Sequence, residues 1–131
     1  MTQINSDIFK VAVDNAPVHI IITDTSGKII YANFAAFAIT GYSVSEMIGK
    51  TPALWGGQMP KEFYNEFWKT LNVDKKTFFG QITNRRKDGE TYTAKVTVTP
   101  LMDEHGEITG FVGIEEDISA VNRVRDVLNN S

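Results

Sequence analysis

Asn84 and Glu115 are the two residues whose types and positions point most directly to chemistry. The segment 78–117 reads as three consecutive antiparallel strands, and alternation with a period of two puts both residues on the same face. The other residues of that face are apolar or small: Phe78, Gly80, Ile82, Ala94, Val96, Val98, Phe111 and Gly113. A buried amide or carboxylate without a hydrogen-bond partner costs roughly 2–7 kcal/mol. We therefore expect the two groups to be satisfied by each other, by a water molecule or by a ligand.

Glycine-containing turns mark the ends of these strands, which we expect at 78–89, 91–101 and 110–117. Gly89 and Gly106 close the two turns, and glycine readily adopts the positive φ that such hairpins require. An antiparallel meander of this kind has to bury one face. The middle strand identifies that face, because alternate residues from Ala94 to Val98 are apolar while those between them are lysine and threonine.

The first part of the chain predicts a helix followed by a two-stranded hairpin. The helix starts at Asn5 or Ser6, and the hairpin strands are expected at 18–24 and 29–32. In the first strand we assign Val18, Ile20 and Ile22 to the core side, which leaves His19 and Ile21 facing away from the core. An exposed isoleucine beside a histidine suggests that the N-terminal helix or a second subunit covers this outer surface.

Further short helices are expected between the hairpin and the meander, and a last one after it. Asn33 is expected to cap the first of these helices, and the capping box that begins at Ser43 is expected to start the second. Pro60 suits the first turn of the third helix. The last helix has one narrow apolar stripe, which requires a partner surface. The expected ranges are 34–40, 44–49, 61–71 and 120–128.

The composition excludes several classes of function. A chain of 131 residues fits one domain, and a net charge of −3 argues against nucleic acid and anionic membrane surfaces as partners. The chain has no cysteine, so disulfides, thiolate metal sites and cysteine adducts are excluded. No apolar run is long enough for a membrane span or a signal peptide, and we expect a cytoplasmic domain without membrane insertion. No catalytic constellation or phosphate-binding loop is present, so the sequence does not predict an enzyme.

Four motifs in this order resemble those of the PAS family over residues 8–119. They are TDTSGKIIYAN (23–33), ITGYSVSEMIGK (39–50), NRRKDGETY (84–92) and EEDIS (115–119). The resemblance implies an α+β fold, with a five-stranded antiparallel sheet, short helices on one face and flanking N- and C-terminal helices. It also implies an N-terminal cap helix at 1–16, a PAS sensor domain at 17–119, and the start of a C-terminal signalling helix at 120–131.

Within the family, residues 59–71 together with NRRKDG resemble the flavin-binding redox sensors of the aerotaxis-receptor type and of the nitrogen-fixation regulatory flavoprotein. This resemblance implies noncovalent FAD, with FMN less favoured. Trp68 matches the helix tryptophan of those domains, and Asn84 matches their pocket asparagine, whose amide suits the uracil-like edge of a flavin ring. The resemblance and the strand faces give these expected cofactor-binding residues: Ile22, Thr51, Trp68, Ile82, Asn84, Val96 and Glu115.

Light-sensing LOV domains, which are also PAS domains, differ from this chain at the positions that matter for their photochemistry. Pro52 stands at the position of their photoactive cysteine, Ala94 at that of their second amide, and Glu115 at that of their glutamine. Adduct photochemistry is therefore excluded. A carboxylate beside a flavin disfavours an anionic reduced ring unless it is protonated, and burial raises the pKa of a glutamate. We hypothesise that Glu115 couples protonation to flavin reduction.

The resemblance implies a sensory module that reports redox or oxygen state to an output partner such as a kinase, a receptor or a regulator. It also implies a homodimer that forms through the terminal helices and the outer sheet face. The alternative is a PAS module that binds another small molecule, or none, and serves as a dimerisation element. Haem is disfavoured, because we expect His19 to face away from the core and His105 to lie in a turn.

Overall fold

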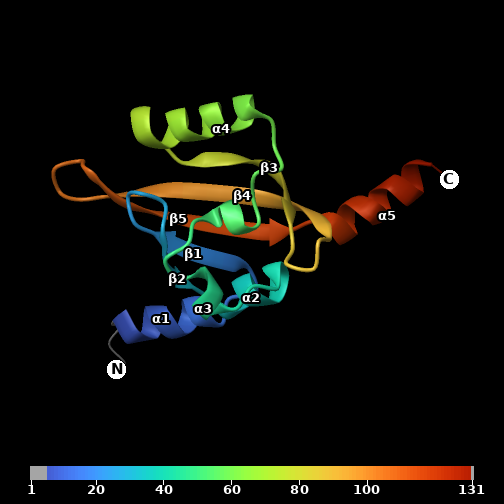
Figure 1. Ribbon diagram of the computed structural model, residues 1–131, viewed down its shortest axis with the longest axis horizontal. Helices are drawn as coiled ribbons and strands as arrows, with labels where there is room; N and C mark the ends of the chain where they lie inside the picture. Colours follow the sequence, from blue (N-terminus) through green and yellow to red (C-terminus); the bar gives the residue numbers. More distant parts are fainter. Residues whose placement is uncertain (1–5, 131) are drawn as a thin grey trace, which may run out of the picture.

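The computed structural model describes residues 6–130, and these form one antiparallel sheet with helices packed around it (Figure 1). The strand order is β2-β1-β5-β4-β3, which confirms the five-stranded α+β fold. Each strand lies close to its expected range: β1 His19–Thr23, β2 Ile29–Ala32, β3 Phe78–Arg85, β4 Thr91–Met102 and β5 Ile108–Asp117.

The last strand, β5, lies at the centre of the sheet and joins the hairpin to the meander. It pairs with β4, its neighbour in sequence, and with β1, which comes from the other end of the chain. In this register Glu115 lies opposite His19 of β1 on one side and opposite Val96 of β4 on the other. Glu115 is therefore held by neighbours from two distant segments.

The helices are short, and their sequences explain where they begin and end. The Asn33 side chain accepts a hydrogen bond from the Ala36 amide and caps one helix, which ends at Gly41 with a φ of 81°. Ser43 and Glu46 form the expected capping box of the next one. The helical segments are α1 Ser6–Asp14, α2 Phe34–Thr40, α3 Val44–Met47, the 3₁₀ turn η1 Pro52–Leu54, α4 Lys61–Trp68, the π-helical turn η2 Lys69–Val73 and α5 Ser119–Asn129.

Asn33 also ties three segments together from the interior. Its side chain is 1% exposed, and its oxygen accepts a second hydrogen bond, from the Ile20 amide of β1. Its nitrogen donates to the carbonyl oxygens of Val13 and Val18. Because all its hydrogen-bonding groups have protein partners, Asn33 is a structural residue, as the sequence predicts.

The charged sequence Arg85-Arg86-Lys87 forms more than a solvated hairpin, because Arg86 is a structural clamp. Its guanidinium donates to the Ile39 carbonyl oxygen at 2.6 Å and to Asp117 Oδ2 at 2.7 Å, and it lies 4.3 Å from the centre of the Tyr92 ring. The side chain therefore joins the end of α2, the end of β5 and the β3–β4 hairpin.

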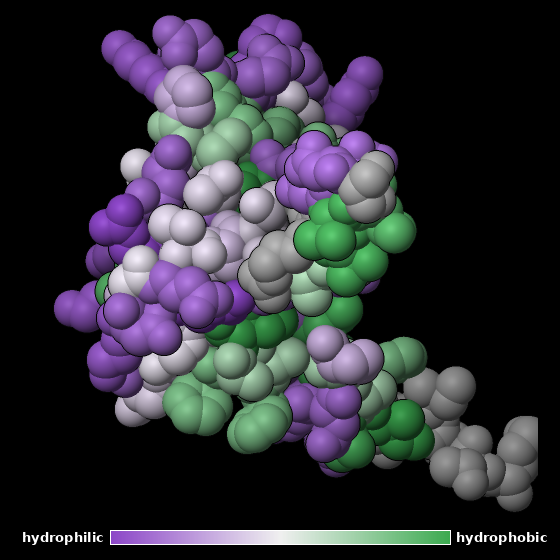
Figure 2. Space-filling view, turned by 90° about the vertical axis from the view of Figure 1, so that its right-hand side faces the viewer, coloured by the Kyte–Doolittle hydropathy of each residue, from purple (hydrophilic) through white to green (hydrophobic). Residues whose placement is uncertain are grey.

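Several large apolar side chains stay on the surface of the terminal helices. In Figure 1 helix α5 projects away from the sheet, and in Figure 2, where it points toward the viewer, green side chains gather on one side of it. Val124 and Val127 of α5 are 60% and 68% exposed, and Phe9 and Val11 of α1 are both 61% exposed. Ile4, which the sequence places on the α1 stripe, lies outside the described residues, as does the side chain of Val121. In the part of the chain from 6 to 130, no helix combines the length and the apolar character that crossing a membrane requires.

Replacing Arg86 by alanine is expected to lower the free energy of unfolding by about 2 kcal/mol, since hydrogen bonds to a charged group are each worth about 1.5–3 kcal/mol and the site is partly exposed. The measurement is urea denaturation followed by circular dichroism. Arg85→Ala is the matched control, because Arg85 is exposed. Equal unfolding midpoints for the two variants would show that the clamp is not structural.

Candidate functional site

A cavity of about 430 Å³ lies between the inner face of the sheet, η1 and α4. This volume falls in the range of roughly 300–1,000 Å³ that is typical of small-molecule sites. Six of the seven residues that the sequence assigns to a cofactor line it: Thr51, Trp68, Ile82, Asn84, Val96 and Glu115. The structure brings these six together, and their role in binding stays a prediction.

Ile22 does not line the cavity, and the expected orientation of its strand was wrong. His19, Ile21 and Thr23 face the cavity and are buried, while Ile20 and Ile22 lie on the opposite face. The register with β5 determines this orientation, because each of these three residues pairs with an inward-facing residue of β5. The outer face is also apolar and partly covered. The Tyr31 hydroxyl of β2 donates to Asp14 of α1 there, so apolar character alone could not identify the inner face.

Asn84 and Glu115 contact each other across the end of the cavity, as the strand alternation predicts. The Asn84 amide nitrogen lies 3.3 Å from Oε1 and 3.4 Å from Oε2 of Glu115, so the amide donates a long hydrogen bond shared between both oxygens. The amide oxygen of Asn84 is buried and has no hydrogen-bond partner among the described residues. An acceptor is therefore available at this end of the cavity.

His19 is the site residue that the sequence interpretation missed. It is fully buried, its Nδ1 lies 3.7 Å from Glu115 Oε2, and neither ring nitrogen has a hydrogen-bond partner among the described residues. The ring packs edge-on against Trp55, with the ring centres 5.2 Å apart. The only signal that could have found His19 is the pairing of β1 with β5, and that pairing is not visible in the local sequence.

Burial shifts the pKa values of the two ionisable groups in opposite directions. Removal from water raises the pKa of Glu115 to about 7, although hydrogen bonds from Asn84 and Trp55 act against this rise. Removal from water lowers the pKa of His19 to about 4. Near neutral pH the histidine is therefore uncharged, and the glutamate lies close to the midpoint of its titration.

Trp55 belongs to the buried floor of the site. Its side chain is 1% exposed and packs in the core cluster with Ile21, Ile29 and Met47. The Trp55 carbonyl oxygen also accepts a hydrogen bond from the Arg85 amide, which fixes the loop against β3. Trp55 thus anchors the loop and also lines the cavity.

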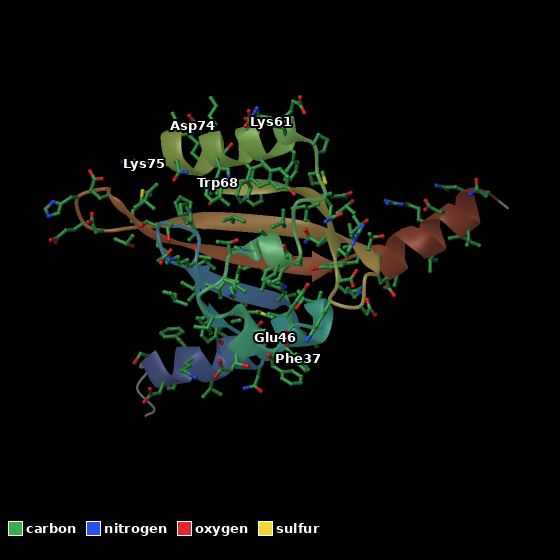
Figure 3. All side chains as sticks on the ribbon, viewed as in Figure 1. Phe37, Glu46, Lys61, Trp68, Asp74 and Lys75 are labelled. Atoms are coloured by element: carbon green, nitrogen blue, oxygen red, sulfur yellow. The ribbon has the colours of Figure 1, made fainter. Side chains whose placement is uncertain are left out.

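Helix α4 and its π-helical extension form an aromatic wall on the other side. Phe63, Tyr64, Phe67, Trp68 and Leu71 line the cavity from this segment. The wider turn of η2 brings Leu71 to full burial beside β4 and β5. Trp68 extends from α4 toward the sheet (Figure 3) and contacts Phe111, yet it is 42% exposed. It therefore lies at the opening rather than in the floor.

This arrangement suits a flat, largely apolar molecule with one polar edge. Aromatic and aliphatic side chains enclose most of the volume, Asn84, Glu115 and His19 supply its buried amide and ionisable groups, and the hydroxyl-bearing residues Thr23, Ser26, Thr51 and Tyr64 also line it. Among the described residues, no lysine or arginine lines the cavity, and no group of three or more metal-ligating side chains occurs. The polar edge of a ligand would meet one available acceptor and a carboxyl group that titrates near neutrality.

The chain belongs to the PAS family, because the family model described as the PAS fold matches residues 7–118. A nitrogen fixation regulatory protein of Klebsiella oxytoca is 34% identical over 131 residues, which cover 99% of this chain and 26% of that protein. The aerotaxis receptor of Escherichia coli is 30% identical over 113 residues, covering 82% of this chain and 22% of the receptor. The solved PAS domain of a Colwellia psychrerythraea protein shares the fold, with a TM-score of 0.79 at 24% identity, over 87% of this chain and 97% of that one.

These comparisons confirm the family that the motifs suggested. The chain spans about a quarter of the length of the two curated relatives. By their names, one relative is a regulator and the other a receptor, and PAS domains act as sensory modules in signal transduction within such proteins.

We expect Glu115 and His19 to contribute opposite pH dependences to stability. The pKa of Glu115 is raised from 4.5 to about 7, so the folded state retains its proton longer and the free energy of unfolding falls as pH rises from 4.5 to 7. The pKa of His19 is lowered from 6.5 to about 4, so the unfolded state binds its proton first and the free energy of unfolding rises from pH 4 to 6.5. In the wild type the two contributions largely cancel.

Single substitutions should therefore reveal each contribution by urea denaturation at a series of pH values. The free energy of unfolding of Glu115→Gln should rise with pH because of His19, and that of His19→Asn should fall with pH because of Glu115. Each change should be on the order of 3 kcal/mol. Glu116→Gln, at an exposed neighbouring position, is the control and should follow the wild type. Identical pH profiles for all four proteins would contradict the assigned shifts.

Proposed function

We propose that the cavity binds the ring of a noncovalent flavin, FAD in preference to FMN, and that the chain is a redox or oxygen sensor for an output partner. The single observation that supports this most is the buried amide oxygen of Asn84, which has no partner among the described residues and lies at the end of an apolar cavity of about 430 Å³. The imide edge of a flavin carries an N–H donor between two carbonyl acceptors, and it complements this oxygen and the neighbouring donors.

The shape and lining of the cavity support the same ligand. A fused aromatic ring gains most from flat apolar walls, and these are supplied by the α4 aromatic residues and by the valines of β4. The residues that line the site include Trp68 and Asn84, the two positions at which the sequence resembles flavin-binding PAS domains. When bound, the flavin supplies the electron-accepting chemistry. The protein residues hold the ring, exclude water from its faces and position groups at its polar edge.

The proposal predicts that the purified protein is yellow or takes up added FAD, and that heating releases FAD into the supernatant. Asn84→Ala should weaken FAD binding about tenfold, equivalent to about 1.4 kcal/mol, since one hydrogen-bonding group at the polar edge is lost. Flavin fluorescence during titration measures the affinity.

Asn72→Ala is the matched control, because Asn72 is exposed on η2. A colourless protein that takes up neither FAD nor FMN would reject the flavin proposal. Equal FAD affinities for Asn84→Ala and Asn72→Ala would reject the role of Asn84.

A second function, dimerisation, is favoured by the exposed apolar side chains of the terminal helices. Phe9 and Val11 of α1 and Val124 and Val127 of α5 are each at least 60% exposed. We propose that a second copy of the chain covers them, so that a change at the cavity alters how the two α5 helices pack. This second function would remain if the cavity bound another molecule or none.

Light scattering tests the dimer directly. We expect the mass of a dimer for the wild type, and a lower mass for a variant in which Val124→Asp and Val127→Asp are combined, because each places a charge in the proposed interface. Asp126→Asn on the same helix is the control. A strict monomer at high protein concentration would contradict the dimer.

A further inference from the structure

Glu115 and His19 are two ionisable side chains that the fold buries against each other at the polar end of the cavity. They are paired residues of β5 and β1, so their side chains project from the same face of the sheet. The two side chains are 9% and 1% exposed. Their nearest nitrogen and oxygen atoms are 3.7 Å apart, which is beyond a direct hydrogen bond but close enough for a charge on one side chain to act on the other.

Among the described residues that line the cavity, no other side chain carries a charge that could neutralise one on this pair. Asn84 from β3 and Trp55 from the loop offer neutral hydrogen-bond donors to the carboxyl group. The remaining ionisable neighbours lie toward β4 and the hairpin. Burial raises the pKa of Tyr92, so its hydroxyl beside Asn84 stays neutral, and the Arg86 charge is already paired with Asp117 and Glu90.

We propose that Glu115 and His19 form one proton-binding site, which gains a proton when a ligand in the cavity becomes negatively charged and loses it when the ligand becomes neutral. The positions of the two side chains support the proton-binding pair without any ligand, whereas its coupling to ligand charge rests on the proposed function. With a flavin in place, an external reductant supplies electrons to the ring. A proton from solvent then forms an O–H bond with the Glu115 carboxylate. Reoxidation by an external electron acceptor returns that proton to solvent.

Elementary electrostatics gives the direction of this response. A negative charge beside a carboxylate disfavours its ionised form, so the site binds its proton more tightly when the ligand is anionic. Because burial lowers the pKa of His19 to about 4, its ring is uncharged near neutral pH, and Glu115 holds the proton of the site. Since burial already places the pKa of Glu115 at about 7, a modest change in ligand charge moves the site across neutral pH.

The proton also changes which hydrogen bonds the site offers. In the structure the Glu115 oxygens accept from the Asn84 amide nitrogen, an arrangement that suits the ionised carboxylate. A protonated Glu115 carries a donor that suits the Asn84 amide oxygen, which has no partner among the described residues. Protonation would therefore favour rotation of the Asn84 amide and present its nitrogen, in place of its oxygen, to the ligand.

The first test uses the purified chain without flavin and needs no ligand. Infrared spectra of protein labelled with ¹³C-glutamate, recorded as a function of pH, should show one carboxylic acid band that persists to near pH 7 and is absent from Glu115→Gln. Glu116→Gln is the control and should keep the band. If no protonated carboxyl group persists near neutrality in the wild type, the proton-binding pair is rejected, whether or not the protein binds flavin.

The second test uses the chain loaded with FAD. Above pH 7 the midpoint potential of the wild type should fall more steeply with pH than that of Glu115→Gln, by the equivalent of up to one proton taken up on reduction. His19→Asn should shift the pH at which this steeper dependence begins. Reduction should also restore the carboxylic acid band above pH 7. If FAD binds but the two potentials share the same pH dependence, coupling to ligand charge is rejected while the flavin proposal stands. If FAD does not bind, the flavin proposal and the coupling fail together, and the infrared result still decides the proton-binding pair.

Discussion

The pairing of β1 with β5 is the constraint on which the rest of the site depends. It connects the first strand of the sheet to the last, and one register places three cavity residues opposite three others: His19 with Glu115, Ile21 with Gly113, and Thr23 with Phe111. The fit is close, because a Cβ atom added at Gly113 would lie 3.3 Å from Ile21 Cγ1. A shift of one residue would turn His19 to the outer face and leave Glu115 buried without its neighbour.

The cost of the cavity explains why an occupant is expected. The walls of this open pocket are mainly apolar, and where no occupant covers them they lose the burial and the dispersion contacts that packing would supply. Water entering past Trp68 reduces the cost, but it cannot satisfy the apolar walls. A ligand that fills the volume therefore stabilises the fold as it binds, so the occupancy of the site and the rigidity of its walls are linked.

Local sequence patterns predicted the meander well and the hairpin poorly, for one physical reason. In β4 only one face is apolar, so alternation identified the inner side, and its extension to Asn84 and Glu115 was correct. In β1 both faces carry apolar residues, because α1 covers part of the outer side, and alternation alone could not choose between them. His19 was missed for this reason, and Ile22 was wrongly included. The role of Arg86 could not be recognised from the local sequence, because its partners, Ile39 and Asp117, are distant in sequence.

The end of β5 offers a short physical route from the cavity to α5. Glu115 faces the cavity, and Asp117, two residues later, accepts hydrogen bonds from Arg86 and from the Ser119 amide at the start of the helix. The Ser119 hydroxyl accepts a hydrogen bond from the Thr93 amide of β4, so the first turn of α5 is fixed to the sheet. Because the β5 backbone is hydrogen-bonded to β1 and β4, a displacement of the backbone at Glu115 has to involve its neighbours. In the proposed sensor, a change of charge or hydrogen bonding at Glu115 would act on the same few residues that set the direction of α5, and a ligand would shift this equilibrium only by the difference in its interaction with the two arrangements.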